Sequence, residues 1–587
     1  MSPTVTRDAS APERAPATFW VALVAAVAAW IGAILALVAS SPRLVAAFHG
    51  FLHSGVASRF PSPTFVPENP FFAGEPLRYY WFYQWLGSLV SRALAIDQIH
   101  AFQTVALASL ALLVATAALA GWNLYRSTAA GLMIGYLALV GMNPLGPAIA
   151  IAKVVLKGEA VWEHPATGTG GDIFVTNQQA DDRLARPLLG ALHIGTDWQS
   201  SQDIVWFFDV SSRGPSIALL MVLAWLMTRP RRRPWTPAAI AVTGGLATAL
   251  NPIVGFSVAG TLMAAAVVVR LARGWRPDLL GRSGAELADS AGFLAGVVLA
   301  WPIYRNMFAV SNTITFTFDE WMVVKTGNLV AGFLVLLPLA LWGVVNPRPG
   351  TSGPQQAGVA SLTLASLFLI GVVPFVTLYE INQHNFVNAA SCLLAVPAAS
   401  WLVGGREPVE RRTVSRRAWL LVIVFLPMTI GLFLAFAGRG DLPLRAAGGE
   451  LRRLPVDGPL DAFYQWARRD TPVDAVLVVN ADRPVKMSGN VTEIPALSGR
   501  AVFVDHNTYM VESYPALADR TDLARRAADG QVLTIDDRRM LDALARPVYI
   551  VNFEADRPEV LARLRAAHGA PVFERGFVAA FRVRTGR

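Results

Sequence analysis

The sequence predicts a polytopic α-helical membrane protein of 11–13 transmembrane helices with a C-terminal α/β domain outside the cytoplasm. Of its 587 residues, 54% are hydrophobic and only 16% are charged, and the mean hydropathy is +0.43, which excludes an ordinary soluble protein. Apolar runs long enough to cross a lipid core recur from Phe19 to Phe436 and stop at Gly438. From Gly458 onward, short apolar alternations indicate a domain that folds in water.

These boundaries divide the chain into three parts. Residues 1–18 are rich in Ser, Pro and Ala and predict a disordered cytoplasmic tail. Residues 19–437 form the predicted transmembrane domain, and residues 438–587 form the outer domain. The first apolar run is too long for a signal-peptide core, so we expect an uncleaved helix. The apolar segments are 19–40, 78–95, 99–121, 128–150, 214–228, 236–250, 253–272, 288–305, 327–345, 358–378, 386–403 and 418–437.

Basic residues set the expected orientation. The net charge is +9, but the arginines gather in short blocks between apolar runs, which is typical of cytoplasmic loops and excludes a nucleic-acid partner. The blocks are Arg229–Arg233, Arg270–Arg282 and Arg406–Arg417. They place the N-terminus inside and the C-terminal domain outside a bacterial-type inner membrane. That arrangement needs an odd number of crossings. Either one of the apolar segments between residues 78 and 157 does not cross the membrane, or this region contains an additional short crossing segment, broken at Asn143-Pro144.

Two long polar stretches, 41–77 and 153–213, then face outward before the C-terminal domain. Asn251-Pro252 is expected to form the outer turn of a helical hairpin over 236–272. The single cysteine, Cys392, lies in an apolar run, so neither a disulfide nor a thiolate metal site is available.

The C-terminal domain alternates strands with helices, which predicts an α/β layered fold. Its expected strands are 474–480, 501–505, 548–553 and 577–583, and its expected helices are 460–469, 515–528, 538–545 and 558–568. It lacks a phosphate loop, a catalytic triad and a His/Cys cluster, so substrate positioning is its expected role. The stretch Ile494–Arg500 is interpreted either as a plain surface loop or as a segment that closes over the membrane-side site.

The first outer loop carries the most distinctive pattern, a proline-rich stretch followed by aromatic residues that open the next helix. The residues are His49-Gly50-Phe51-Leu52-His53, Pro67-Glu68-Asn69-Pro70, Gly74 and Arg78-Tyr79-Tyr80-Trp81-Phe82-Tyr83. This pattern resembles the GT-C superfamily of membrane glycosyltransferases, and within it an uncharacterised branch named for a Tyr-Tyr-Tyr motif. The resemblance implies transfer of a sugar from a polyprenyl-phosphate carrier in the membrane to a glycan or protein acceptor on the outer face.

The resemblance also implies a catalytic carboxylate in the first loop, and here the chain departs from the pattern. No aspartate lies between Ser41 and Ile96. The candidates for a catalytic base are therefore Glu68 and Glu75, or His53 and His49, because histidine also accepts protons near neutral pH. Arg78, Tyr79 and Tyr80 are interpreted either as a platform for the sugar or carrier, or as part of an interfacial aromatic belt.

Two further polar groups complete the candidates. Asp181 and Asp182 in the second loop are weak candidates for a divalent cation, which no spacing motif supports. Glu380, Asn382 and His384 open a later apolar segment and are candidates for substrate binding, as is Arg305 for a lipid phosphate. We expect the first-loop, aromatic and third-cluster groups to line one cavity. The alternative functions are a transporter or flippase for a lipid-linked substrate, and a non-catalytic envelope-assembly protein.

Overall fold

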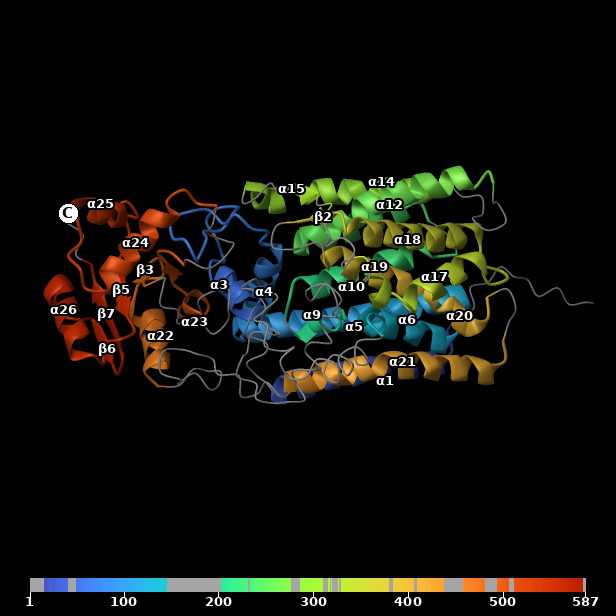
Figure 1. Cartoon of the computed structure of the whole chain (residues 1–587), viewed down its shortest axis with the longest axis horizontal. Coiled ribbons are helices and arrows are strands. Elements are labelled where there is room, and N and C mark those ends of the chain that lie inside the picture. The colour runs from blue at the N-terminus through green and yellow to red at the C-terminus, as the bar shows by residue number, and fades with distance from the viewer. Residues whose placement is uncertain are drawn as a thin grey trace, which may run out of the picture.

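The computed structural model describes most of the transmembrane bundle and of the C-terminal domain. The described residues are 15–40, 49–144, 202–208, 210–230, 233–275, 285–309, 315–316, 318, 326, 329–378, 384–405, 409–437, 458–480, 493–505, 511 and 513–583. The chain forms a long helical bundle, and the C-terminal domain extends it at one end (Figure 1).

The helices of the bundle follow the apolar segments of the sequence. They are α1 (Ala17–Ser40), α3 (Phe51–Ala57), α4 (Phe82–Leu94), α5 (Gln98–Tyr125), α6 (Thr128–Val140), α9 (Val205–Phe208), α10 (Arg213–Met227), α11 (Thr236–Leu250), α12 (Pro252–Ala272), α14 (Ala285–Leu299), α15 (Trp301–Tyr304), η4 (Arg305–Ala309), α17 (Leu336–Val345), α18 (Gly353–Val372), α19 (His384–Ala398), α20 (Ser400–Val403) and α21 (Arg411–Ala437). Two short strands, β1 (Thr315–Phe316) and β2 (Val376–Thr377), pair in an antiparallel manner.

The chain is an integral multi-pass membrane protein, as predicted. Within the described residues, five helices are long and apolar enough to cross a membrane, or six if the bent pair Ala285–Leu299 and Trp301–Met307 is one span. That pair bends by 48° where Pro302 removes a backbone donor. Four shorter apolar helices accompany them, including α6 and α10. The figure of 11–13 crossings stays a prediction.

The expected break at Asn251-Pro252 is confirmed. Helix α11 ends at Leu250 and α12 begins at Pro252, the position where a missing N–H costs least. The Asn251 side chain caps α12 by accepting a hydrogen bond from the Val254 N–H at 3.2 Å.

The bundle end remote from the C-terminal domain gathers the ends of several helices. Gln355 near the start of α18 donates to the carbonyl of Asn123 near the end of α5, at 3.1 Å. Ser352 donates to the carbonyl of Pro230, just after α10. Arg417 of α21 donates to the carbonyl of Trp401 in α20, at 2.5 Å. The described parts of the basic blocks around Arg229 and Arg417 therefore lie at one end.

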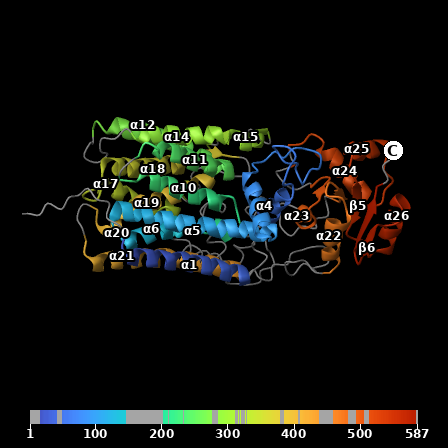
Figure 2. The ribbon, with the colours of Figure 1, turned by 180° about the vertical axis from the view of Figure 1, so that it is seen from behind.

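The C-terminal domain is a five-stranded mixed sheet with helices, as predicted. Its elements are α22 (Pro459–Asp470), β3 (Val476–Val479), α23 (Ile494–Ser498), β4 (Ala501–Val502), α24 (Leu517–Ala528), α25 (Ile535–Asp542), β5 (Val548–Asn552), α26 (Pro558–His568), β6 (Phe573–Arg575) and β7 (Val578–Arg582). The strand order is β4-β3-β5-β7-β6, parallel from β4 to β5 and antiparallel from there. Figure 2 shows this domain, with α22, α24, α25 and α26, at the end of the molecule beyond α4.

The first loop pairs with the edge strand β4 of this sheet. The Val502 N–H donates to the Pro70 carbonyl at 2.9 Å, and the Ala73 N–H donates to the Val502 carbonyl at 3.0 Å. The Asp505 N–H donates to the Phe71 carbonyl at 2.9 Å. A free sheet edge would leave such groups unpaired, so the loop satisfies them and is itself fixed. Phe71, Phe72 and Leu77 of the loop share one buried core with the domain.

Candidate functional site

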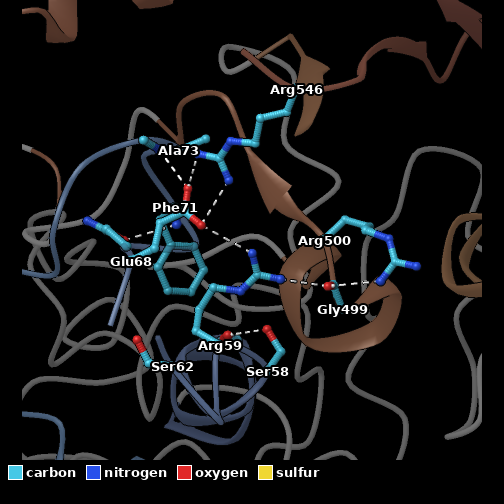
Figure 3. A network of polar contacts seen from close by, with 12 residues as sticks. Ser58, Arg59, Ser62, Glu68, Phe71, Ala73, Gly499, Arg500 and Arg546 are labelled. Carbon is cyan, nitrogen blue, oxygen red and sulfur yellow. Dashed lines mark hydrogen bonds and ion pairs between the residues drawn. The ribbon is translucent and has the colours of Figure 1, made fainter. Parts of the chain in front are cut away.

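Glu68 lies at the centre of an ionic contact between the first loop and the C-terminal domain (Figure 3). Arg546 binds it with both terminal nitrogens, Nη1 to Oε2 at 3.1 Å and Nη2 to Oε1 at 2.5 Å. Arg59 Nη1 reaches Oε2 at 3.4 Å, and the Gly74 N–H donates to Oε1 at 2.7 Å. Arg59 also donates from Nη2 to the Gly499 carbonyl at 2.8 Å, which ties α3 to α23. We call Glu68, Arg59 and Arg546 the clamp.

The surroundings of Glu68 hold its carboxylate in the charged form. Burial alone raises its pKa, but the hydrogen bonds from Arg546 and Gly74 and the positive charges of Arg546 and Arg59 outweigh burial, so the pKa lies below its ordinary value. Both carboxylate oxygens already accept hydrogen bonds from the arginines. This geometry favours Glu68 as a structural anion that docks the domain.

A second group of contacts continues the docking beside the clamp. Arg78 donates to the Ser513 carbonyl at 2.7 Å and lies over the Tyr514 ring, 4.3 Å from its centroid. The Tyr514 hydroxyl donates to the Pro76 carbonyl at 2.5 Å, and its ring stacks on Phe72 at 4.6 Å. Arg520 donates to the Ala73 carbonyl at 2.6 Å. Arg78 is thus engaged by the C-terminal domain.

Glu75 lies on the same loop in a different setting. Its side chain is half-buried, and no hydrogen bond or ion pair to its carboxylate is found among the described residues. The positive charge of Arg520 and the phenol of Tyr514 are close enough to interact with it electrostatically. Of the two first-loop glutamates, Glu75 is therefore the one whose lone pairs remain available to a substrate.

The two tyrosines that open α4 form a polar network with α10 and α12. Tyr79 donates its hydroxyl proton to the Tyr80 hydroxyl at 2.7 Å, and the Tyr80 and Ser212 hydroxyls lie 2.9 Å apart. Asn251 donates from Nδ2 to Ser212 Oγ at 3.2 Å and to the Tyr80 hydroxyl at 3.4 Å. Tyr80 is buried, so it is not a belt residue at the lipid surface. We call Tyr79, Tyr80, Ser212 and Asn251 the tyrosine network.

Arg213 adds a positive charge to this network. It begins α10 directly after Ser212, and its guanidinium lies over the Trp206 ring, 4.3 Å from the centroid. Its charge acts on both Tyr80 and His53. One cation thus lies within electrostatic reach of the network and of α3.

His53 belongs to α3 and is fully buried. Its ring packs edge-on against Tyr83 at 4.8 Å and stacks near His49 at 5.5 Å. With the Gln84 amide oxygen turned toward it, that oxygen accepts from Nδ1 at 2.9 Å, while the amide nitrogen donates to the carbonyls of Tyr80 and Trp81 at 3.2 Å each. This arrangement leaves a lone pair on Nε2, which is buried and has no hydrogen-bond partner among the described residues. Burial, followed by the charges of His49 and Arg213, lowers the pKa of His53, so the ring is neutral near pH 7.

The described residues group the sequence candidates in three places. Glu68, Glu75 and Arg78 lie against the C-terminal domain, and Tyr79 and Tyr80 join α10 and α12. His49 directly precedes α3, and His53 lies within it. Arg305 follows α15 and is exposed. Asp181, Asp182, Glu380 and Asn382 lie outside the described residues, as does the side chain of His384 at the start of α19. The single shared cavity stays a prediction.

Four participants were missed by sequence reasoning: Gln84, Ser212, Asn251 and, as a site cation, Arg213. Asn251 was noticed only as a turn residue. The signal for Arg213 is an arginine that opens a long apolar helix, where charge is costly unless it has a polar partner. In the described part of the chain, no three His, Cys, Asp or Glu side chains form a metal-binding group.

The segment Ile494–Arg500 does more than form a surface loop. It folds as helix α23, and Gly499 ends that helix at φ +67°, a conformation that favours glycine. Pro495 packs close to Gly55 of α3. Arg500 is occupied within the domain, donating to the carbonyls of Arg468 at 2.8 Å and Thr471 at 2.9 Å.

One family model and several solved structures are similar to this chain. Residues 33–214 match a family model described as uncharacterized membrane protein (DUF2298). No curated protein matches this chain. ArnT from Cupriavidus metallidurans bound to undecaprenyl phosphate has a TM-score of 0.51 at 11% identity, covering 97% of this chain and 98% of that one. Its apo structure gives a TM-score of 0.50 at 12% identity, covering 96% and 98%.

An archaeal oligosaccharyltransferase, AglB from Archaeoglobus fulgidus in complex with an inhibitory peptide and a dolichol-phosphate, also matches. The TM-score is 0.46 at 11% identity, covering 94% of this chain and 71% of that one. At these identities the likeness concerns the fold. The chain is a membrane protein whose fold is similar to that of the GT-C glycosyltransferase ArnT at low sequence identity.

Proposed function

We propose that the protein transfers a sugar from a polyprenyl-phosphate carrier to an acceptor hydroxyl at the bundle end where the C-terminal domain docks. The observation that carries the proposal is the tyrosine network with Arg213, whose Tyr80, Ser212 and Asn251 are buried next to a loop that the C-terminal domain holds in place. The fold shared with ArnT, whose structure contains undecaprenyl phosphate, supports the class of carrier.

Each group has a role in this proposal. A base takes the proton of the acceptor hydroxyl as its oxygen attacks the anomeric carbon, and the carbon–oxygen bond to the carrier phosphate breaks with its electron pair on the phosphate. Arg213 stabilises the charge that develops on the phosphate oxygen. Tyr80 and Tyr79 position the sugar. Glu75 and His53 are the candidates for the base, and Glu68 is a positioning residue that holds the loop.

The orientation of the site belongs to the same proposal. Arginines concentrate at the opposite end of the bundle, which favours that end as cytoplasmic. The docking end and the C-terminal domain then face the outside, where the transfer occurs. A C-terminal reporter that is active only in the cytoplasm should be silent, and a strong signal would contradict the orientation.

The central test is native mass spectrometry of the purified full chain. We expect polyprenyl phosphate to co-purify with the wild type and to be lost from Arg213→Gln, because the cation that binds the phosphate is gone. Arg539→Gln, which changes an exposed arginine of the C-terminal domain, is the matched control and should retain the lipid. The proposal fails if the wild type carries no polyprenyl phosphate after addition of the lipid, or if both variants retain it equally.

One observation favours a second candidate, ion-coupled transport. Asp203 is 1% exposed in the bundle, accepts a hydrogen bond from Asn388, and forms no ion pair with the described residues. A carboxylate in such a place often moves protons or cations. Under this alternative, Asp203→Asn would abolish transport of the lipid-linked substrate by proteoliposomes and would leave lipid co-purification intact. Under the transferase proposal, the wild type does not transport that substrate.

A further inference from the structure

Helices α17 and α20 lie toward the bundle end remote from the C-terminal domain (Figure 1). A pocket lies at this end, between the residues that end α5 and α17 and their neighbours in α18 and α20. Its cavity volume is about 20 Å³, and the pocket is partly open to solvent. Its polar lining comes from Tyr125, Arg348, Thr351, Gln356 and Ser400. None of these residues belongs to the tyrosine network or the clamp.

Two lining groups lack the partners that burial demands. The Nη1 atom of Arg348 is buried and has no hydrogen-bond partner among the described residues, and the same is true of Ser400 Oγ. The other polar groups are engaged: Tyr125 donates to the Val396 carbonyl at 2.8 Å, and Thr351 donates to the Arg348 carbonyl at 2.7 Å. An unpaired buried donor costs free energy, so two of them on one pocket point to an acceptor from outside the chain.

The positive charges near the pocket favour an acceptor that is negatively charged. Burial and the nearby charge of Arg126 lower the pKa of Arg348. Two positive charges, those of Arg348 and Arg126, therefore act on the same space. A guanidinium with a free edge and a hydroxyl donor match the oxygens of a phosphate group, which accepts several hydrogen bonds at once.

We propose that this pocket binds a phosphate group, either the headgroup of an anionic phospholipid or free phosphate, through Arg348 and Ser400. The site is independent of the transfer reaction, because it lies at the other end of the bundle. A bundle end is at the level of lipid headgroups, and basic pockets between helices at such ends bind anionic headgroups. Bound phosphate would satisfy the Arg348 and Ser400 donors and tie α17 to α20.

The test measures the melting temperature of the full chain with two probes. In the lipid arm, nanodiscs of phosphatidylcholine are compared with nanodiscs that also contain phosphatidylglycerol. In the free-anion arm, detergent-solubilised protein is titrated with inorganic phosphate at constant ionic strength set by chloride. The variants are Arg348→Gln, Ser400→Ala and the matched control Arg412→Gln, an exposed arginine at the start of α21.

We expect one probe or both to raise the melting temperature of the wild type and of Arg412→Gln, and the responding arm identifies the source of the phosphate. Arg348→Gln should weaken the apparent affinity about 10-fold or more, since a charge-assisted hydrogen bond is lost. Ser400→Ala should melt higher than the wild type without the probe, because an unpaired hydroxyl is removed, yet respond less to it.

Opposite effects of Ser400→Ala with and without the probe keep the proposal testable if Arg348→Gln folds poorly. The proposal is overturned if neither probe stabilises the wild type, which would leave water as the occupant of the pocket. It is also overturned if Arg348→Gln and Arg412→Gln lose the response equally, which would indicate a general effect of surface charge.

Discussion

The clamp and the tyrosine network both lie near the start of α4, yet they satisfy their polar groups differently. In the clamp, both oxygens of Glu68 accept hydrogen bonds from arginines of two separate parts of the chain. In contrast, no hydrogen-bond partner of His53 Nε2 or of the Glu75 carboxylate is found among the described residues. A carboxylate whose oxygens all accept hydrogen bonds from arginines holds the fold together. A group with a free lone pair can still bind a substrate or accept a proton.

This difference reassigns the candidates that residue type alone made equivalent. Glu68 and Glu75 are seven positions apart on one loop and both were expected as bases. The arginines that saturate Glu68 come from positions 59 and 546, and no local pattern links those positions. The contrast predicts that variants of Glu75 or His53 lose activity, whereas variants of the clamp lose stability.

The largest expected effect is on transfer. Glu75→Gln and His53→Ala should be assayed beside Glu68→Gln for the glycoconjugate that is lost on deletion of the protein. Removal of the true base should slow transfer by about 10²–10⁴-fold without loss of folded protein. We expect the base to be Glu75 or His53. If Glu68→Gln alone shows that loss at unchanged stability, the comparison is reversed, and full activity in all three variants would exclude the first loop as the source of the base.

The next effect concerns the stability of the docked loop. Glu68→Ala leaves Arg59 and Arg546 without their shared anion, and we expect a cost of about 2–3 kcal/mol, since the site is largely buried. The measurement is hydrogen exchange of residues 70–76, combined with a double-mutant cycle using Arg546→Ala. A coupling energy near zero in the cycle would show that the ion pair does not dock the loop.

A smaller effect should separate backbone strain from docking. Gly74 has φ +87°, and an added Cβ would lie 3.0 Å from Leu544 Cδ2. Gly569 has the same φ with nothing within 4 Å of such a Cβ. We expect Gly569→Ala to cost about 1 kcal/mol from strain alone, and Gly74→Ala to cost about 1 kcal/mol more because it crowds the docked domain. Equal losses would show that Leu544 gives way freely.

Much of the fold was predictable because it depends on local patterns. Apolar length predicted α1, α5, α12 and α18, and the Asn-Pro dipeptide predicted the break between α11 and α12. In the C-terminal domain the alternation predicted β3, β5 and β7. Strand β6 and the first-loop helix α3 were missed, because each is short and stable only through its tertiary packing.

The candidate site was less predictable for a physical reason. Tyr79 and Tyr80 are visible in the sequence as an aromatic cluster. Their hydrogen-bond partners, Ser212 and Asn251, directly precede α10 and α12, far along the chain. Hydrogen bonds between distant segments leave no spacing signature. The proposed docking role of Glu68 likewise depends on Arg546, 478 positions away, so residue type alone predicted a base.

The smallest expected effect is a pH dependence that belongs to the clamp alone. The pKa of Glu68 is lowered from its ordinary value of 4.5 in the folded chain, because the hydrogen bonds from Arg546 and Gly74 and the nearby positive charges outweigh burial. A depressed carboxyl pKa contributes stability that is present above the unfolded-state pKa and is lost as the pH falls through the folded-state pKa. Glu68→Gln cannot make this contribution at any pH. The difference in melting temperature between wild type and Glu68→Gln should therefore be constant from about pH 7 to 5 and shrink progressively below about pH 4.5. Asp536→Asn, which removes an exposed carboxylate of α25, is the control and should show no comparable change. A difference that stays constant down to about pH 3 would mean that Glu68 stabilises the docked loop by its shape and hydrogen bonds and not by its charge.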